Sequence, residues 1–106
     1  MSEFVFVYST FPDDASARRV AEALITAKLA ACVNIHAITS IYEWQGKPKI
    51  SPEIAALIKT RRDLTDAAIA VARPLHPYTT PCFLILPIEG GNADYLAWAR
   101  AQTTQK

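Results

Sequence analysis

The sequence predicts an α/β domain of the α+β kind, a ferredoxin-like split β-α-β sandwich, and three observations support this class. Two short, wholly apolar runs predict buried strands. Two stretches with apolar residues at helical spacing predict amphipathic helices. A long alternating stretch that folds back at Gln45-Gly46 predicts a hairpin between the second and third strands. With 106 residues, the chain suits one domain, residues 1–106.

The first strand is predicted over Phe4–Tyr8, a continuous run of aromatic and β-branched residues that suits the centre of a sheet. Pro12-Asp13-Asp14 then predicts a helix start, because Asp side chains accept the free N–H groups of a first turn. We expect this helix to run from about Asp14 to Lys28. Its apolar stripe consists of Ala17, Val20, Ala21, Leu24 and Ile25.

Two long strands are predicted to form the hairpin. From Ala31 to Trp44 the apolar period is two, and its phase slips near Ala37-Ile38, which predicts a bend or bulge there. The returning strand is expected from about Lys47 to Thr60. Pro48 and Pro52 lack backbone donors, so the first half of this strand should lie at an edge or a bulge.

The C-terminal part of the sequence predicts a helix, a strand and an extra helix. The second helical stripe begins at Leu64 and is expected to end near Pro74, because proline restricts the residue before it. Pro81–Glu89 predicts a second apolar strand, and Asn92 or Asp94 predicts the start of a short C-terminal helix. In a split β-α-β fold, the first and third strands are central and the other two are edges.

Composition and charge exclude several classes of partner. The net charge is +1, and the longest basic runs are Arg18-Arg19 and Arg61-Arg62, so we expect no nucleic-acid binding. There is no basic amphipathic face and no apolar run of membrane length, so we expect no membrane association. The start, Met1–Phe4, lacks the basic residues of a signal peptide. We therefore expect a cytoplasmic protein in which Cys32 and Cys82 are reduced.

Metal ligation has two candidate residues, His76 and Cys32. Neither belongs to a C-x-x-C or H-x-x-x-H spacing. Cys32 most simply packs as a small hydrophobic residue. The segment His76–Pro81 indicates either a rigid helix-to-strand connection fixed by two prolines, or a ligand or metal contact. No cofactor is required for a domain of this size to fold.

Four residues are candidates for lining a ligand cleft: Glu53, Lys59, Tyr78 and Trp44. Tyr78 offers both a ring and a hydroxyl. Glu53 and Lys59 face the same side of one predicted strand, but roughly 20 Å of strand separates them. They cannot pair within the strand. They are therefore solvated charges, interface charges or members of a cleft between subunits.

The sequence offers no support for catalysis. It contains no Ser/His/acid motif, no phosphate-binding glycine loop and no C-x-x-C. An acylphosphatase of related fold needs an arginine after the first strand, where this chain has Ser9–Pro12. We therefore expect that the protein is not an enzyme.

The predicted hairpin is too long to be covered by the helices of its own chain. Ala31–Trp44 would span roughly 45 Å as a strand, whereas the first helix spans roughly 22 Å. An apolar projection of this kind is a liability on a monomer and predicts a closed dimer or trimer. The expected interface residues are Ile38, Ile41, Tyr42, Trp44, Ile50 and Ile54.

Further information comes from segments spread over nearly the whole chain. They are Tyr8-Ser9-Thr10, Leu29–Asn34, Trp44–Lys47, Ile58-Lys59-Thr60, His76–Pro81 and Asp94-Tyr95-Leu96. In this order and spacing the chain resembles the CutA divalent-cation-tolerance family. The resemblance implies a homotrimer with a PII-like shape and a link to divalent metal tolerance, copper in particular. Some family members carry Cys and His at the positions of Ser9 and Leu75, and this chain lacks both.

These observations predict a trimeric, non-catalytic binding protein associated with tolerance of, or response to, divalent metal cations such as copper. Two alternatives stay open. One is a PII-like signalling module that binds a small ligand in clefts between subunits. The other is a structural trimer that binds a protein partner.

Overall fold

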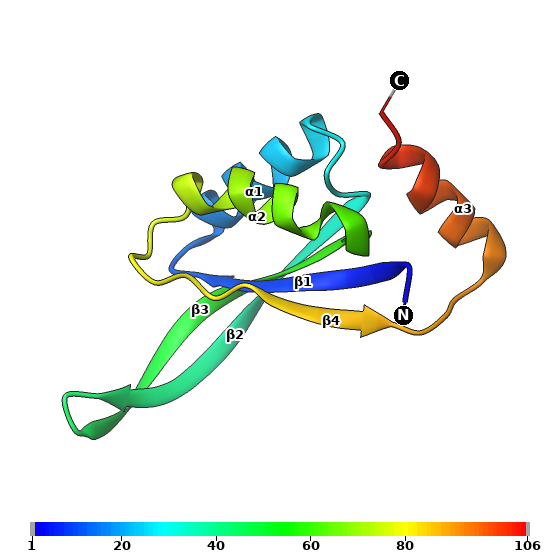
Figure 1. Ribbon diagram of the computed structural model, residues 1–106. Coiled ribbons are helices and arrows are strands. Elements are labelled where there is room, and N and C mark those ends of the chain that lie inside the picture. Colours follow the sequence, from blue (N-terminus) through cyan, green and yellow to red (C-terminus); the bar gives the residue numbers. More distant parts are fainter. Residues whose placement is uncertain (1, 106) are drawn as a thin grey trace.

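The computed structural model describes residues 2–105 of the chain (Figure 1). Its elements are β1 (Phe4–Phe11), α1 (Asp14–Thr26), β2 (Cys32–Trp44), β3 (Lys47–Arg61), α2 (Thr65–Leu75), β4 (Leu84–Ile88) and α3 (Ala93–Gln102), with a short 3-10 turn, Arg62–Leu64, before α2. The strands form one antiparallel sheet in the order β2-β3-β1-β4. The predicted ferredoxin-like order, with β1 and β3 in the centre, is confirmed.

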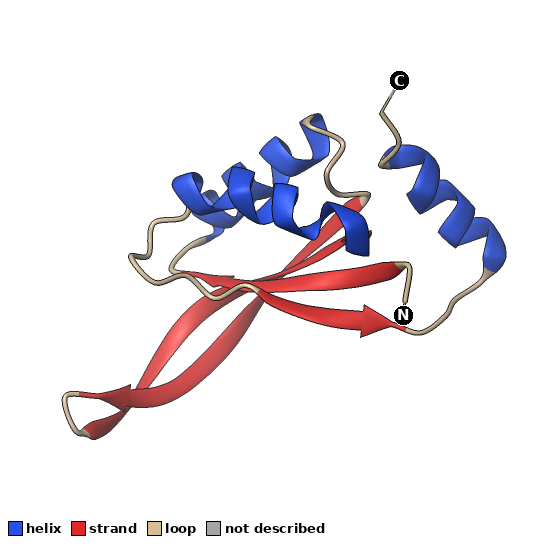
Figure 2. Cartoon of the chain, in the orientation of Figure 1, coloured by secondary structure: helices blue, strands red, loops and turns tan. Residues whose placement is uncertain are grey.

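The two faces of the sheet differ in how they are covered. Helices α1 and α2 lie over one face, while α3 lies beyond the ends of β1 and β4 (Figure 2). Along β1, Val5, Val7, Ser9 and Phe11 are buried, and the residues between them from Phe6 on are only partly buried. This alternation places the main core between the sheet and the two helices.

Helix α1 begins as the sequence predicts. The Asp13 side chain accepts a hydrogen bond from the backbone N–H of Ser16 at 2.8 Å and caps the first turn. The helix ends at Thr26, two residues earlier than expected, and Lys28 then adopts a left-handed conformation with φ 61° that reverses the chain. Ile25 is 43 % exposed, so it lies outside the buried part of the predicted stripe.

The main core joins the sheet to α1 and α2. Its buried members are Val7, Phe11, Ala17, Val20, Leu24, Ala30, Ala56, Ile58, Ala68 and Ala72. A second, smaller cluster holds α3 to the sheet through Phe4, Ala31 and Ala99. In the main core, α1 and α2 both present small alanine side chains to the strands, which allows close packing of helix on sheet.

The β2–β3 hairpin extends well beyond the rest of the sheet, so the molecule measures 47 × 26 × 21 Å along its principal axes (Figure 1). The pairing of β2 with β3 is continuous along both strands, so of the bend or bulge predicted near Ala37-Ile38 the bulge is wrong. The ribbon curves through strand twist instead. Every residue from Ile41 to Ile50 is exposed, so the slip in apolar phase marks the point where the hairpin leaves its own core.

Two expectations for the hairpin are confirmed. Gln45 and Gly46 form a two-residue turn with positive φ angles of 53° and 80°. The pairing of β3 with β1 begins only at Ile54, so the first half of β3, which contains Pro48 and Pro52, is an edge.

One element boundary agrees with the prediction and another differs from it. Helix α2 ends at Leu75, close to Pro74 as predicted, and the partly buried Leu75 packs on the core. Strand β4 begins at Leu84 rather than at Pro81, because its pairing with β1 starts there. Cys82, which falls inside the predicted strand, therefore precedes the observed one.

Candidate functional site

A cluster of polar and aromatic side chains lies where the connection after α2 meets the end of β1. His76 is buried, and its ring stacks on that of Phe11 with 4.4 Å between the ring centroids. Its Nε2 lies 2.9 Å from the carbonyl oxygen of Thr10, and its Nδ1 accepts a hydrogen bond from the backbone N–H of Tyr78 at 3.1 Å. A carbonyl can only accept, so Nε2 carries the proton and the ring is neutral.

The surroundings of His76 give it a structural role. Burial lowers the pKa of His76, against the raising effects of the Thr10 carbonyl and of Glu53. Because both ring nitrogens are hydrogen-bonded within the chain, neither has a lone pair available to a metal in this arrangement. The geometry therefore favours the rigid connection over the metal contact that the sequence also allowed.

Cys32, the other predicted metal ligand, lies away from His76. It opens β2 opposite Lys59, whereas Thr10, which contacts His76, pairs with Ala55. The corresponding positions are about 13 Å apart along β3. Within residues 2–105, no three His, Cys, Asp or Glu side chains gather closely enough to hold a metal ion.

The loop after α2 also joins two of the four predicted cleft residues. The hydroxyl of Tyr78 donates a hydrogen bond to Oε2 of Glu53 on β3 at 2.6 Å. Burial, together with the Glu53 carboxylate, raises the pKa of the Tyr78 hydroxyl above its ordinary value. The pair is half-buried and fixes the loop to the strand, and it places one carboxylate close to the base of the hairpin.

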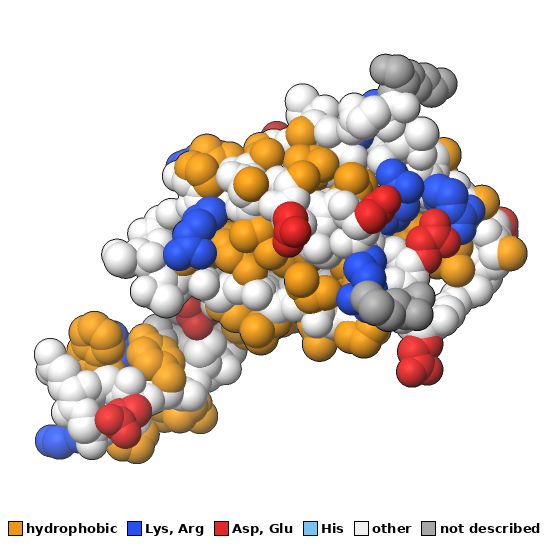
Figure 3. Space-filling view, viewed as in Figure 1, with side chains coloured by type: hydrophobic (Ala, Val, Ile, Leu, Met, Phe, Trp, Pro, Cys, Tyr) orange, Lys and Arg blue, Asp and Glu red, His pale blue; other side chains and the backbone are white. Residues whose placement is uncertain are grey.

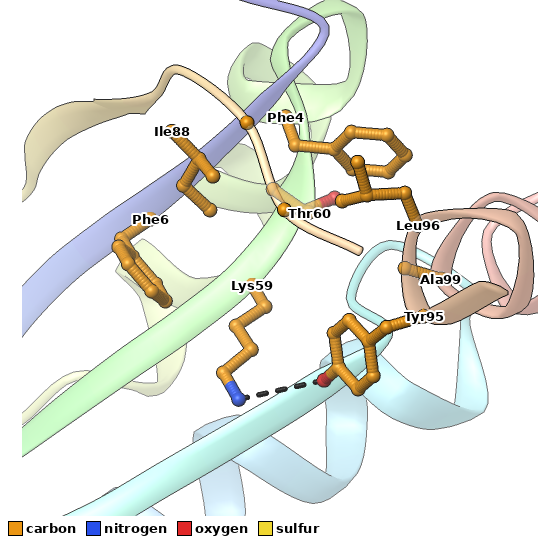
Figure 4. A pocket seen from close by; sticks show the side chains of 10 residues that line it. Phe4, Phe6, Lys59, Thr60, Ile88, Tyr95, Leu96 and Ala99 are labelled. Atoms are coloured by element: carbon orange, nitrogen blue, oxygen red, sulfur yellow. Dashed lines mark hydrogen bonds between the residues drawn. The ribbon is translucent and has the colours of Figure 1, made fainter. Parts of the chain in front are cut away.

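Lys59, the third predicted cleft residue, lies at a separate place. Its Nζ is 3.4 Å from the hydroxyl of Tyr95 on α3 and 5.4 Å from the centre of that ring (Figure 4). The two side chains border a cavity of about 150 Å³ between α3 and the strands. Lys59 and Glu53 are thus apart, as the sequence predicts.

Trp44 lies at the far end of the hairpin, remote from the other cleft candidates. It is 57 % exposed, and the Nζ of Lys49 lies 5.5 Å from its ring centre. Apolar side chains gather on the projecting end of the hairpin (Figure 3). Of the predicted interface residues, Ile41, Tyr42, Trp44 and Ile50 are exposed and Ile38 and Ile54 are half-buried.

Both cysteines, Cys32 and Cys82, are free thiols in the structure. Burial raises the pKa of the Cys82 thiol, which makes it less reactive as a nucleophile. Within the described part of the chain, no helix combines the length and the apolar character that are needed to span a bilayer.

Residues 5–102 match the sequence profile of the family described as "CutA1 divalent ion tolerance protein". This chain belongs to the CutA1 family. The divalent-cation tolerance protein CutA of Pectobacterium atrosepticum is 39 % identical over 102 residues, which cover 95 % of this chain and 93 % of that protein. Human protein CutA is 42 % identical over 97 residues, which cover 91 % of this chain but 54 % of the longer human protein. The family is described by ion tolerance and not by a reaction.

Solved CutA structures share the fold over nearly the full length. The protein described as the periplasmic divalent cation tolerance protein CutA of Archaeoglobus fulgidus is 38 % identical with a TM-score of 0.91, covering 95 % of this chain and 99 % of that one. CutA1 of Ehrlichia chaffeensis is 31 % identical with a TM-score of 0.93, covering 99 % of both chains. CutA1 of Oryza sativa is 40 % identical with a TM-score of 0.91, covering 99 % of this chain and 97 % of that one.

One site residue, Tyr95, was missed by the sequence reasoning, which placed it in the C-terminal helix without a partner. In the structure it contacts Lys59, which is 36 positions earlier in the chain. No periodicity or motif spacing links residues so far apart. The available signal for this contact was chemical. Lys59 lies near the end of a largely apolar strand, and a charged side chain in such surroundings needs a polar partner.

Proposed function

We propose that this CutA1 family member is a homotrimeric, non-catalytic binding protein that acts in tolerance of, or response to, divalent cations, with copper as the first cation to test. Its membership of a family described by divalent ion tolerance supports the link to cations. The proposal needs no resident cofactor. It also places the protein in the cytoplasm, as the sequence predicts, although the Archaeoglobus relative is described as periplasmic.

The observation that carries the trimer is the uncovered hairpin. Ile41 and Ile50 form a cross-strand pair and are 68 % and 69 % exposed. Large aliphatic side chains on a projecting ribbon contribute to stability only when another surface covers them and removes them from water.

A second uncovered surface lies on β4, whose outer edge has no strand partner among the described residues. Leu84, Ile85 and Leu86 on this strand are 57 %, 43 % and 43 % exposed. A hairpin of one subunit and the β4 edge of the next could cover each other in a closed ring, leaving no free edge. Closure by three subunits agrees with the family resemblance.

The trimer is tested by light scattering at micromolar concentration and again after dilution. We expect a species of about three times the 11.7 kDa chain mass at both concentrations. A stable monomer of 11.7 kDa would contradict the proposal.

The link to copper is tested by titration calorimetry with Cu²⁺ and Zn²⁺. Both His76 nitrogens are engaged, and among residues 2–105 Cys32 belongs to no group of three His, Cys, Asp or Glu side chains that could hold a metal ion. We therefore expect the native protein to bind these ions weakly. The combined variant His76→Ala, Cys32→Ser removes both predicted ligands. Submicromolar copper affinity that survives both substitutions would show that these residues are not the site.

A second candidate function is a PII-like module that binds a small anionic ligand in clefts between subunits. It is favoured by Lys59, whose ammonium has no carboxylate within 4.0 Å among residues 2–105. Thermal-shift measurements against nucleotides and metals separate the two candidates. Stabilisation by a nucleotide and by none of the metals would favour the module.

A further inference from the structure

The cavity under α3 has an apolar interior and a single charged side chain (Figure 4). Phe4 and Phe6 of β1, Ile88 of β4 and Leu96 of α3 form its walls. Lys59 is the one charged residue among those that line it within the described chain. An apolar hollow with one or two polar groups placed at its border is the usual form of a small-molecule site.

Lys59 has an unfilled capacity to bind an anion. No carboxylate lies within 4.0 Å of its ammonium among residues 2–105. Its polar neighbour is the hydroxyl of Tyr95, and the distance of 3.4 Å makes that hydrogen bond a long one. Tyr95 also offers its own hydroxyl as a donor. Two donors therefore converge at the border of the cavity with no acceptor from this chain between them.

We propose that this cavity binds a small carboxylic acid with a flat apolar body. The carboxylate would accept hydrogen bonds from Lys59 Nζ and Tyr95 Oη, and the apolar body would lie between Phe4, Phe6 and Leu96. The volume of about 150 Å³ suits one aromatic ring, because an apolar cavity of about this size in another protein takes up benzene. A ring without a carboxylate would leave the ammonium unpaired, and a carboxylate without a ring would leave the walls uncovered.

One chain supplies the residues that line the cavity. Phe6 and Ile88, however, lie on the same face of the sheet as Leu84 and Leu86, which the proposed trimer covers, so the proposal requires that the cavity stays open in the assembly. It does not depend on metal binding. It uses Lys59, which the sequence assigned to a cleft between subunits, and it specifies the ligand class for the second candidate function. Light scattering tests the trimer, calorimetry with metals tests the cation link, and ligand titration tests the cavity. A failure of one of these leaves the others interpretable.

The test is an NMR titration of the full chain with phenylacetate, following the backbone amides of Gly90, Gly91 and Leu96 around the cavity. Phenylacetamide has the same shape without the charge, and acetate has the charge without the ring. We expect saturable shifts at these amides with phenylacetate. We expect affinities roughly tenfold to a hundredfold weaker for phenylacetamide, since the ion pair with the Lys59 ammonium is replaced by a hydrogen bond to a neutral carbonyl oxygen.

Lys59→Met tests the ammonium while keeping the length of the side chain. It should weaken phenylacetate binding by roughly the same factor of ten to a hundred. Lys47→Met is the matched control, because Lys47 lies on the same strand at the hairpin turn, about 40 Å away. It removes the same charge and should leave the affinity unchanged.

Several results would overturn the proposal. They are an absence of saturable shifts at these amides, equal affinity for phenylacetate and phenylacetamide, and equal loss in the two lysine variants. If Lys59→Met does not fold, Tyr95→Phe removes the second donor, and the three ligands still separate charge from shape on the native chain. A cavity already filled by a side chain of a second copy would show no shifts and would also overturn it.

Discussion

Replacing Ser9 with alanine should stabilise this fold. Ser9 lies on β1 in the face beneath α1 and α2 and is 0 % exposed. Its hydroxyl has no hydrogen-bond partner among the described residues. On folding, this hydroxyl loses its hydrogen bonds to water and gains none in return, which opposes folding. Alanine removes the hydroxyl and keeps the β-carbon in the core.

The size of the effect follows from two opposing contributions. A buried hydroxyl without a partner costs about 1–3 kcal/mol. Removing its oxygen loses a few packing contacts, which costs roughly 0.5–1 kcal/mol. The desolvation cost is larger, so the free energy of unfolding should rise by about 0.5–2 kcal/mol. A gain of 1 kcal/mol corresponds to about 4 °C in the melting temperature of a domain of this size.

Guanidinium unfolding at a fixed protein concentration measures this change, because subunit association would add a concentration dependence. Thr60→Val is the matched control. Thr60 is 1 % exposed on the same face, but its hydroxyl donates to the Leu29 carbonyl oxygen at 2.7 Å. Its loss should destabilise the protein by about 1–2 kcal/mol. A Ser9→Ala variant that lost stability, or two variants that shifted in the same direction, would refute the reasoning.

Three other predictions concern the loop after α2 and the hairpin. Burial lowers the pKa of His76 below its ordinary value of 6.5. Below pH 6.5 this histidine therefore binds a proton more readily in the unfolded chain than in the folded one. The free energy of unfolding should fall as the pH drops below 6.5. His76→Gln should flatten this slope in urea unfolding, and an unchanged slope would contradict the assignment. Tyr78→Phe should cost about 1 kcal/mol, since the half-buried Glu53 loses its donor, and unfolding midpoints that match the native protein would argue against it. Tyr42→Asp combined with Trp44→Asp should give aggregated or unfolded chain in light scattering; a well-folded monomer would show that the hairpin needs no covering.

Much of the fold could be predicted because local patterns and core packing agree along most of the chain. The Asp13 cap, the buried face of α1 and the Gln45-Gly46 turn each follow from residues that are adjacent or one helical turn apart. Boundaries were less predictable where tertiary contacts decide them. Leu75 packs on the core at the end of α2, one residue after Pro74, and β4 pairs with β1 only from Leu84 onward, although β1 itself extends to Phe11.

The site was predicted only in part, because its contacts join distant segments. The sequence marked Glu53, Lys59 and Tyr78 as unusual, but it did not show that Tyr78 binds Glu53 while Lys59 faces Tyr95. It also left His76 between two roles. That choice depends on the Thr10 carbonyl, 66 positions away, which fixes the tautomer and occupies the second ring nitrogen.

The mistaken bulge in the hairpin has an instructive cause. An alternating apolar pattern reports which face of a strand is buried, and a slip in phase is usually attributed to an extra residue. Here the ladder continues without a break past Ala37-Ile38, yet apolar side chains change faces. The change of phase coincides with the point where the hairpin leaves the core of its own chain and its side chains become exposed. In this chain the side chains that change faces are Ile38, Tyr42 and Trp44, and the last two are exposed. A two-stranded ribbon is at best marginally stable alone in water, so a sequence that keeps these residues apolar is consistent with a hairpin that is covered by other subunits.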